Sequence, residues 1–268
     1  MVKKHALFCV FCFLFTTVSS QIQIDSMELQ ELDEVVVSDS RFPIKRENSG
    51  KTVIKINSRE LENNQGKTVA EIINTKSGIE INGSRSRQGE VLGVFARGGR
   101  GRQVLILIDG VRVSDPSSFS QEYDLRLLAT SGVESIEIIK GAASTLYGMS
   151  AATAVISIKT KEASDKKISG DFQSSLGTNQ SSSDQNYNIA EFSNSALVSG
   201  SLDSFRYSLG FSNVYTNGLS SIITETNEED PFSRYNINLK LGYSFNDKIN
   251  LTAVSYTHLT LPTTWSRC

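Results

Sequence analysis

Arginine is the residue whose spacing most suggests chemistry in this chain of 268 residues. A basic cluster lies in and beside two polar loops and a glycine-rich turn, and it consists of Arg85, Arg87, Arg97, Arg100, Arg102 and Arg112. Guanidinium groups attract anions and bind carboxylate or phosphate oxygens. The cluster is typical either of a site for an anionic ligand or of ion pairs with a neighbouring surface. The spacing leaves both open.

Cysteine and histidine, which supply thiol nucleophiles, general bases and zinc ligands, are missing from most of the chain. No Cys, His or Trp occurs between Gln21 and Val254. This absence excludes Cys nucleophiles, Ser-His-Asp triads and the usual zinc ligand sets from that interval. Those classes of catalytic and zinc site are therefore not expected in this part of the chain.

Two acidic features have simpler explanations than chemistry. A glycosidase needs only paired carboxylates, and Asp109 is a candidate for one of them. Because Gly110 follows it, however, Asp109 is more simply a turn residue. The run Asn227-Glu228-Glu229-Asp230 offers oxygen ligands for calcium, but it lacks the alternating spacing of a dedicated site and is typical of a solvated loop.

The first twenty residues have the pattern of a secretory signal peptide. Lys3 and Lys4 precede an apolar run from Ala6 to Val18, and small residues stand before Gln21. The pair Cys9 and Cys12 lies inside this segment, so a redox role is disfavoured. We predict an exported protein.

The glycine-rich turn, residues 97–102, could be mistaken for an RNA-binding or a dinucleotide-binding motif. A strand is expected after it, whereas a dinucleotide fingerprint requires a helix there. The formal net charge of the chain is −2. Nucleic acid is therefore not an expected partner.

Residues 51–161 have the pattern of a small mixed α/β domain. Thr68 precedes a short helical pattern as an N-cap would, and Asn57 or Ser58 could cap another one. The stretch Val133 to Lys140 is rich in β-branched residues, and Gly141 permits a turn after it. The expected strands are 52–56, 79–82, 91–96, 104–108, 133–140 and 154–160, and the expected helices are 59–62, 69–74, 123–129 and 143–147.

Residues 162–254 change to a two-residue alternation. Tyr235, Ile237, Leu239 and Leu241 alternate with polar residues, and four further runs are similar. Each run is about the ten residues that a tilted strand needs to cross a bilayer. Long polar connections alternate with short ones, as in outer-membrane barrels. The alternative is a soluble β-sandwich whose sheets have one solvent-exposed face.

Four stretches together resemble TonB-dependent outer-membrane transporters. Asp33 to Ser38 (DEVVVS) is similar to the Ton box of that family, although an ordinary edge strand explains those residues equally well. Phe95 to Gly98 (FARG) and Val104 to Val111 (VLILIDGV) resemble central strands of its plug domain. Val133 to Gly148 (VESIEIIKGAASTLYG) resembles its late plug signature, with Lys140 and Ala142 where arginine and proline are usual.

The resemblance implies an α+β plug domain followed by the first strands of an antiparallel transmembrane β-barrel, here incomplete. The expected organisation is a signal peptide (1–20), Ton box and linker (21–50), plug (51–161), barrel start (162–254) and a tail (255–268). The tail breaks the alternation and resembles adaptor or vector sequence. We expect it to be non-native.

The resemblance also implies a function, which is transport and not catalysis, with no catalytic residue, no metal site, no cofactor and no enzymatic activity. A scarce ligand, cobalamin or a ferric siderophore, would be taken up through the outer membrane of a Gram-negative bacterium. The TonB protein would supply the energy, and outer-membrane lipid would surround the barrel. The alternative is a plug-type binding or signalling module of the periplasm or outer membrane, without transport.

Three sets of site residues follow from the resemblance. TonB would bind the Ton box, Asp33, Glu34, Val35, Val36, Val37 and Ser38. Two loops would contact the substrate through Ser84, Arg85, Arg87, Gln88, Ser117, Ser118 and Phe119. Salt bridges between plug and barrel wall would involve Arg97, Arg112 and Lys140.

Overall fold

The chain divides into a unit of residues 1–34 and a unit of residues 35–268, and only the second contains described residues. The computed structural model describes residues 35–36, 44–45, 50–64, 66–82, 92–116, 121–178, 183, 189–218, 231–246 and 248–262.

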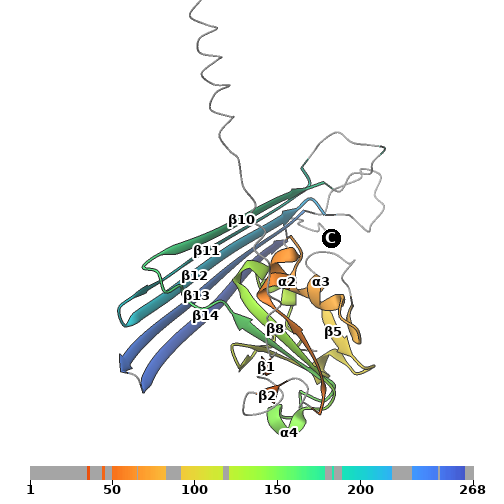
Figure 1. Ribbon diagram of the computed structural model, residues 1–268. Helices are drawn as coiled ribbons and strands as arrows, with labels where there is room; N and C mark the ends of the chain where they lie inside the picture. Colours follow the sequence, from red (N-terminus) through yellow and green to blue (C-terminus); the bar gives the residue numbers. More distant parts are fainter. Residues whose placement is uncertain are drawn as a thin grey trace, which may run out of the picture. The chain divides into compact units, whose positions relative to one another are not determined.

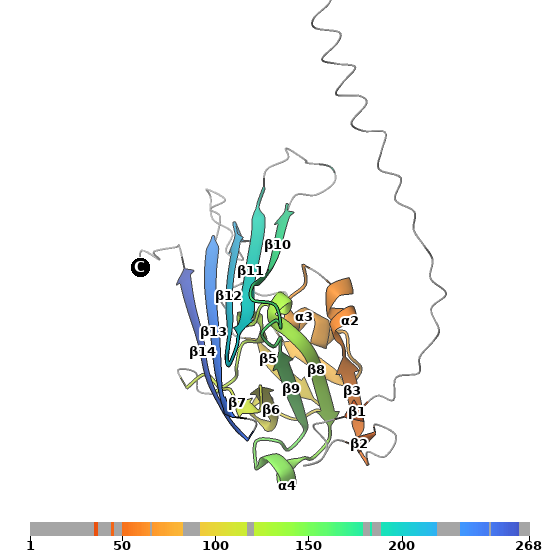
Figure 2. The ribbon, with the colours of Figure 1, turned by 60° about the vertical axis from the view of Figure 1, so that its left-hand side comes forward.

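A five-stranded mixed sheet forms the centre of the N-terminal domain (Figure 1). Its strands in spatial order are β3 (Thr52–Ile56), β8 (Val133–Lys140), β9 (Ala154–Thr160), β6 (Val104–Ile108) and β7 (Val111–Arg112). Strands β8 and β9 pair antiparallel and lie side by side (Figure 2), whereas β6 and β9 pair parallel. All five residues of β6 are buried, because apolar residues cover both faces of this sheet.

Two short helices cover one face of the mixed sheet, and polar side chains start both. In α2 (Ser58–Asn63), the N-cap Asn57 accepts a hydrogen bond from the Glu60 amide. In α3 (Val69–Asn74), Thr68 and Glu71 form a reciprocal capping box, which satisfies two amides that the helix leaves free. Both caps agree with the sequence prediction.

The core of this domain is made of β-branched side chains. Ile136, Ile138, Ile156 and Ile158 are at most 1% exposed, and they pack with α3 on one face of the sheet. Val53, Ile139 and Val155 form a second cluster on the opposite face, with Ala143 and Ala151. The segment around α4 (Ser144–Tyr147) supplies those alanines.

The remaining elements of the domain are short. A two-stranded sheet consists of β4 (Ile79–Asn82) and β5 (Gly93–Ala96). The 3-10 turns are η2 (Gly101–Gln103), η3 (Leu125–Leu127) and η4 (Thr130–Gly132). Only η3 is helical in the stretch 123–129, so the longer helix expected there is wrong. No helix among the described residues is long and apolar enough to cross a membrane.

Steric constraints explain the glycine-rich turn. Gly98 has a φ of 73°, which side chains disfavour. A Cβ on Gly101 would lie 1.7 Å from Oε1 of Glu122. The glycines therefore permit a tight turn and a close approach within the domain.

A second sheet contains the five long strands that follow, each paired with the next in the sequence. They are β10 (Ser169–Gly177), β11 (Glu191–Leu202), β12 (Phe205–Thr216), β13 (Phe232–Asn246) and β14 (Ile249–Pro262). All four pairings are antiparallel. The predicted alternation gives this sheet one apolar and one polar face.

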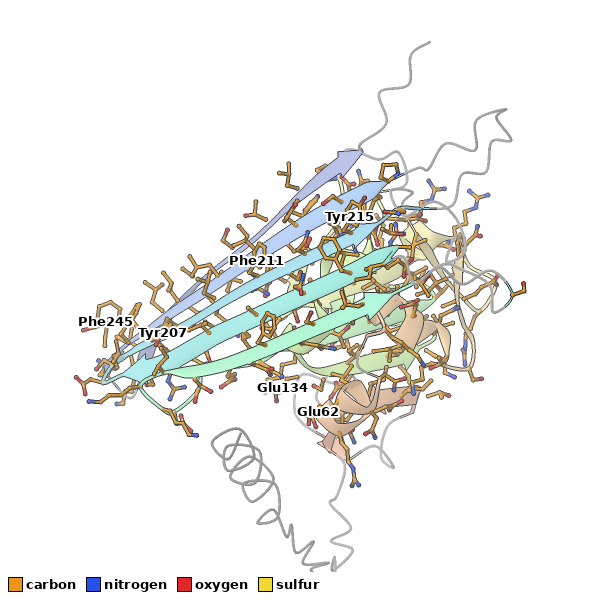
Figure 3. All side chains as sticks on the ribbon, turned by 90° about the horizontal axis from the view of Figure 1, so that it is seen from above. Glu62, Glu134, Tyr207, Phe211, Tyr215 and Phe245 are labelled. Atoms are coloured by element: carbon orange, nitrogen blue, oxygen red, sulfur yellow. The ribbon has the colours of Figure 1, made fainter. Side chains whose placement is uncertain are left out.

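The apolar face carries aromatic rings near both ends of its strands. Phe205, Tyr207 and Tyr243 lie near the short turns, and Phe192 stacks on Tyr215 near the other end. Figure 3 shows Tyr207 and Phe245 at one end of the sheet, Tyr215 toward the other and Phe211 between them. Aliphatic residues such as Leu209 and Leu239 occupy the middle rows and are exposed.

The polar face packs against the N-terminal domain. Ser208, Ser212 and Asn236 lie on this face and are buried. The Asn236 side-chain amide donates to the Ser212 hydroxyl over 3.0 Å. The N-terminal domain therefore covers the polar face of the long sheet, whereas the apolar face is exposed.

Two local expectations differ from the structure. Val35 and Val36 form β1 (Val35–Val36), which pairs antiparallel with β2 (Ile44–Lys45), so the valines do have a neighbouring strand in the local sequence. Strand β14 continues through the stretch 255–262, where the alternation was expected to break. Backbone pairing with β13 sustains it there. Whether the tail is native stays a prediction.

The core predicts a contrast between two apolar truncations. Ile138→Ala should lower the free energy of unfolding by about 2–5 kcal/mol, because a fully buried side chain leaves a cavity. Val111→Ala should change it by less than about 0.5 kcal/mol, because Val111 is 67% exposed. Hydrogen exchange of the β8 and β9 amides in the full-length protein would measure both. Equal effects would contradict this core.

Candidate functional site

The clearest constellation of polar groups centres on Asp109, in the turn between β6 and β7. Asp109 has a φ of 49° and Gly110 a φ of 79°. Positive φ at both central residues is the requirement of a tight hairpin turn, and Asp tolerates it better than most residues. The turn aims the carboxylate at the end of β9. Its Oδ1 accepts from the Thr160 amide over 2.9 Å, and its Oδ2 accepts from the Thr160 hydroxyl over 2.6 Å.

The same carboxylate reaches the long sheet. Lys240 of β13 donates from Nζ to Oδ2 of Asp109 over 3.2 Å and to the Thr160 hydroxyl over 3.4 Å. The Tyr256 hydroxyl of β14 also donates to Oδ2, over 3.3 Å. The side chains of Lys240 and Asp109 are 26% and 17% exposed. Asp109 thus connects the hairpin, the end of β9 and the polar face of the long sheet.

These contacts set the protonation state of Asp109. Burial acts to raise its pKa, but the hydrogen bonds from Thr160 and the charge of Lys240 outweigh burial and hold the pKa below its usual value. Because the folded state lowers this pKa, the contribution to stability is present above the usual pKa of about 3.9. It is lost as the pH falls through the lowered value.

A second polar contact lies in the segment that leads to β8. Arg126 donates from Nε and Nη2 to the Asp124 carboxylate over 2.7–3.1 Å, and Arg126 is only 8% exposed. Burial raises the pKa of the neighbouring Tyr123 to about 12, which keeps its hydroxyl protonated. This segment faces the long sheet across two cavities.

The two cavities have volumes of about 380 and 250 Å³. The larger is lined by Arg112, Tyr123 and Ala129 of the N-terminal domain and by Gly210 and Asn238 of the long sheet. The smaller contains Arg126 and Arg234 in its wall. Polar space therefore remains between the domain and the sheet.

The structure describes only some of the predicted site residues. Ser84, Arg85, Arg87, Gln88, Ser117, Ser118 and Phe119 lie outside the described residues. So do Asp33, Glu34, Val37 and Ser38 of the predicted Ton box. Its other members, Val35 and Val36, pair with Lys45 and Ile44.

The three predicted salt-bridge residues make other contacts. Lys140 donates from Nζ to the Ser77 carbonyl over 3.0 Å. Nη1 of Arg97 would lie 3.2 Å from a Cβ placed on Gly141, within the same domain. Arg112 lines the larger cavity and so faces the long sheet. None of the three forms an ion pair with another residue in the described ranges, and their assignment stays a prediction.

Sequence reasoning missed the residues that connect the domain to the long sheet. Asp109 was interpreted as a turn residue, which is correct but incomplete. Its partner Lys240 lies 131 positions away. The available signal was the alternation in β13, which places Lys240 on the polar face, where a charged side chain needs a partner.

Comparison with known proteins shows which family these features resemble. Residues 45–155 match the family described as TonB-dependent Receptor Plug Domain. The vitamin B12 transporter BtuB of Vibrio cholerae serotype O1 (strain ATCC 39541) is 31% identical over 165 residues, which cover 62% of this chain and 26% of that protein. BtuB of Vibrio vulnificus (strain CMCP6) is 33% identical over 160 residues, which cover 59% and 25%. The chain spans about a quarter of the length of these curated relatives.

Solved structures share the fold at low sequence identity. The siderophore receptor PirA from Pseudomonas aeruginosa has a TM-score of 0.58 and 21% identity, over 79% of this chain and 36% of that one. The ferric enterobactin receptor PfeA from Pseudomonas aeruginosa has a TM-score of 0.61 and 20% identity, over 78% and 33%. The predicted resemblance is confirmed: residues 45–155 match the plug domain of TonB-dependent receptors, and the strands that follow resemble the start of the barrel of such a receptor.

The Asp109 contacts predict a large effect from one small substitution. Asp109→Asn should lower the local stability of β6 and β9 by about 1–2 kcal/mol, because the charge-assisted hydrogen bonds to Thr160 and Lys240 are weakened. Hydrogen exchange of those amides in the full-length protein is the measurement.

Asp171→Asn is the matched control. Asp171 pairs with Lys161 over 3.5 Å, and its side chain is 54% exposed. An exposed pair of this kind contributes little, so the change should stay below about 0.5 kcal/mol. If the two variants lose the same stability, Asp109 has no special role in joining plug and barrel strands.

Proposed function

We propose that this chain is part of a receptor that takes up a scarce ligand across the outer membrane by energy-coupled transport. One observation carries the proposal. A plug domain is continuous with strands whose polar face packs against it, through Asp109 and Lys240, and whose apolar face is exposed. A soluble sandwich would cover that apolar face instead.

The apolar face fits a bilayer in height. Phe205 and Tyr215 lie near opposite ends of β12, and strands rise about 3.4 Å per residue, so their separation along the strand is about 34 Å. A strand tilt of about 40° reduces this to about 26 Å along the membrane normal, close to the apolar band of about 25 Å in outer-membrane barrels. The aromatic rows would lie at the two interfaces, in contact with outer-membrane lipid.

Energy coupling is proposed to act through Asp33 to Ser38. An extended segment can add itself to the edge of a partner's sheet, where backbone hydrogen bonds provide most of the affinity. Val35 and Val36 already pair with β2 in this structure. Binding to TonB would therefore exchange one set of backbone hydrogen bonds for another, at low net cost.

The ligand is proposed to be cobalamin or a ferric siderophore. Curated relatives are named vitamin B12 transporters, and structural neighbours include siderophore receptors. Substrate contact is proposed for the loops that contain Ser84, Arg85, Arg87 and Gln88, and Ser117, Ser118 and Phe119. Polar loops on a rigid scaffold are the usual place for binding residues.

Deleting Asp33 to Ser38 from the full-length protein should separate binding from transport. Cells should still bind labelled cobalamin or ferric enterobactin at the surface, because the proposed ligand site lies elsewhere. Accumulation of the bound label inside the cells should fall to background, because the energy-coupling contact is gone. Uptake of both radiolabelled ligands is the measurement.

Deletion of Met27 to Leu32 is the control, since it shortens the same segment by the same length. Uptake should then continue. Normal accumulation after loss of Asp33 to Ser38 would show that the Ton-box assignment is wrong. Surface binding that never leads to accumulation, even in the intact protein, would favour a binding module without transport.

A further inference from the structure

Arg234 is a buried cation with one hydrogen-bond donor that no described residue satisfies. It lies on the polar face of β13 and is 2% exposed. Its Nε has no hydrogen-bond partner among the described residues. The recorded contact of its guanidinium is with the Phe232 ring, 5.9 Å from the ring centroid. The Asn213 side chain donates to the Arg234 backbone carbonyl, so this bond does not involve the guanidinium.

The carboxylates around Arg234 have other partners. Asp124 accepts hydrogen bonds from Arg126, as described above. Glu191 accepts from the Thr216 hydroxyl over 3.2 Å. Glu71 is held by the Thr68 capping box. Asp124 still attracts the Arg234 guanidinium through its charge, and Glu71 and Glu191 share the same cavity wall. None of the three accepts a hydrogen bond from the buried Nε, and a buried donor without an acceptor costs about 1–3 kcal/mol, so a further oxygen acceptor would stabilise it.

The space beside Arg234 can hold such an anion. Arg234 and Arg126 line the smaller cavity, of about 250 Å³, and hydroxyl groups of Ser175, Ser193, Ser212 and Thr216 share its wall. A water molecule takes up about 30 Å³ in the liquid, so a phosphate or carboxylate group fits with room to spare. The cavity lies between the plug and the ends of the strands that lead into the long connections 178–190 and 217–231.

We propose that this cavity binds an oxyanion, a phosphate or carboxylate group, with the Arg234 guanidinium as its principal ligand. A guanidinium presents several donors to such a group, and hydroxyl donors complete the shell. The inference rests on the proposed function in one respect: the oxyanion would be carried by the transported molecule as it passes between plug and barrel wall. An apolar ligand would leave Arg234 unpaired, and a cation would be repelled by it.

Inorganic phosphate is the probe for the site itself. Isothermal titration calorimetry of the purified full-length protein, at constant ionic strength with chloride as the reference anion, would measure its binding. Arg234→Met should weaken phosphate binding at least about tenfold, because the buried guanidinium is removed. Arg206→Met is the matched control. Arg206 lies on the same polar face of the long sheet, in β12, but it is exposed. The affinity for phosphate should therefore stay within about twofold.

The stability of the Arg234→Met variant is a second measurement. Without phosphate, Arg234→Met should unfold no more easily than the wild type, because an apolar side chain replaces an unpaired charge. A variant that binds phosphate as tightly as the wild type would overturn the proposal. So would a variant that unfolds more easily, since Arg234 would then have a protein partner.

The two proposals can fail separately. Loss of phosphate binding together with about tenfold slower uptake of labelled cobalamin or ferric enterobactin would support the site and its role in transport. Loss of phosphate binding in a protein whose wild type takes up neither label would support the anion site and overturn the transport function. Unchanged uptake in a variant that has lost phosphate binding would overturn the role of the site in passage.

Discussion

The carboxylate of Asp109 is the interaction on which the relation between plug and barrel strands depends. It closes the β6–β7 turn, holds the end of β9 through Thr160 and pairs with Lys240 of β13. Thr160 is the last residue of the plug sheet, so the carboxylate acts where the chain leaves the plug. One side chain thereby contacts the plug hairpin, the exit of the chain and strand β13.

The contacts inside the plug differ in kind from those at its surface. Inside, β-branched side chains such as Ile136 and Ile156 are buried on both sides of the sheet, and separating them exposes apolar area to water. At the barrel strands, the contacts include the hydroxyls of Thr160 and Tyr256 and two partly exposed ion pairs, Asp109 with Lys240 and Lys161 with Asp171. Water can replace such polar contacts at a modest net cost of about 0.5–1.5 kcal/mol each. The fold of the plug is therefore held more strongly than its attachment to the barrel strands.

Most of the local structure could be predicted from the sequence, because it depends on neighbouring residues. Thr68 and Glu71 identify the start of α3, and alternation identifies β13 over most of its length. The pairing of Asp109 with Lys240 could not be predicted, since it depends on how the chain returns after 131 positions.

Arg234 was missed for a related reason: it stands just before the alternating run, and its burial arises from the plug packed against it. The helix expected over 123–129 is longer than the 3-10 turn found at Leu125–Leu127. Capping and packing, more than propensity, decide the length of a helix.

Energy dependence of uptake tests the central claim most directly. Cells that produce the full-length protein would be given labelled cobalamin or ferric enterobactin, with and without a protonophore that collapses the proton gradient of the inner membrane. The account predicts that surface binding of one of these ligands persists while its accumulation stops when the gradient is lost. Accumulation that continues at the same rate without the gradient would contradict energy-coupled transport through this plug.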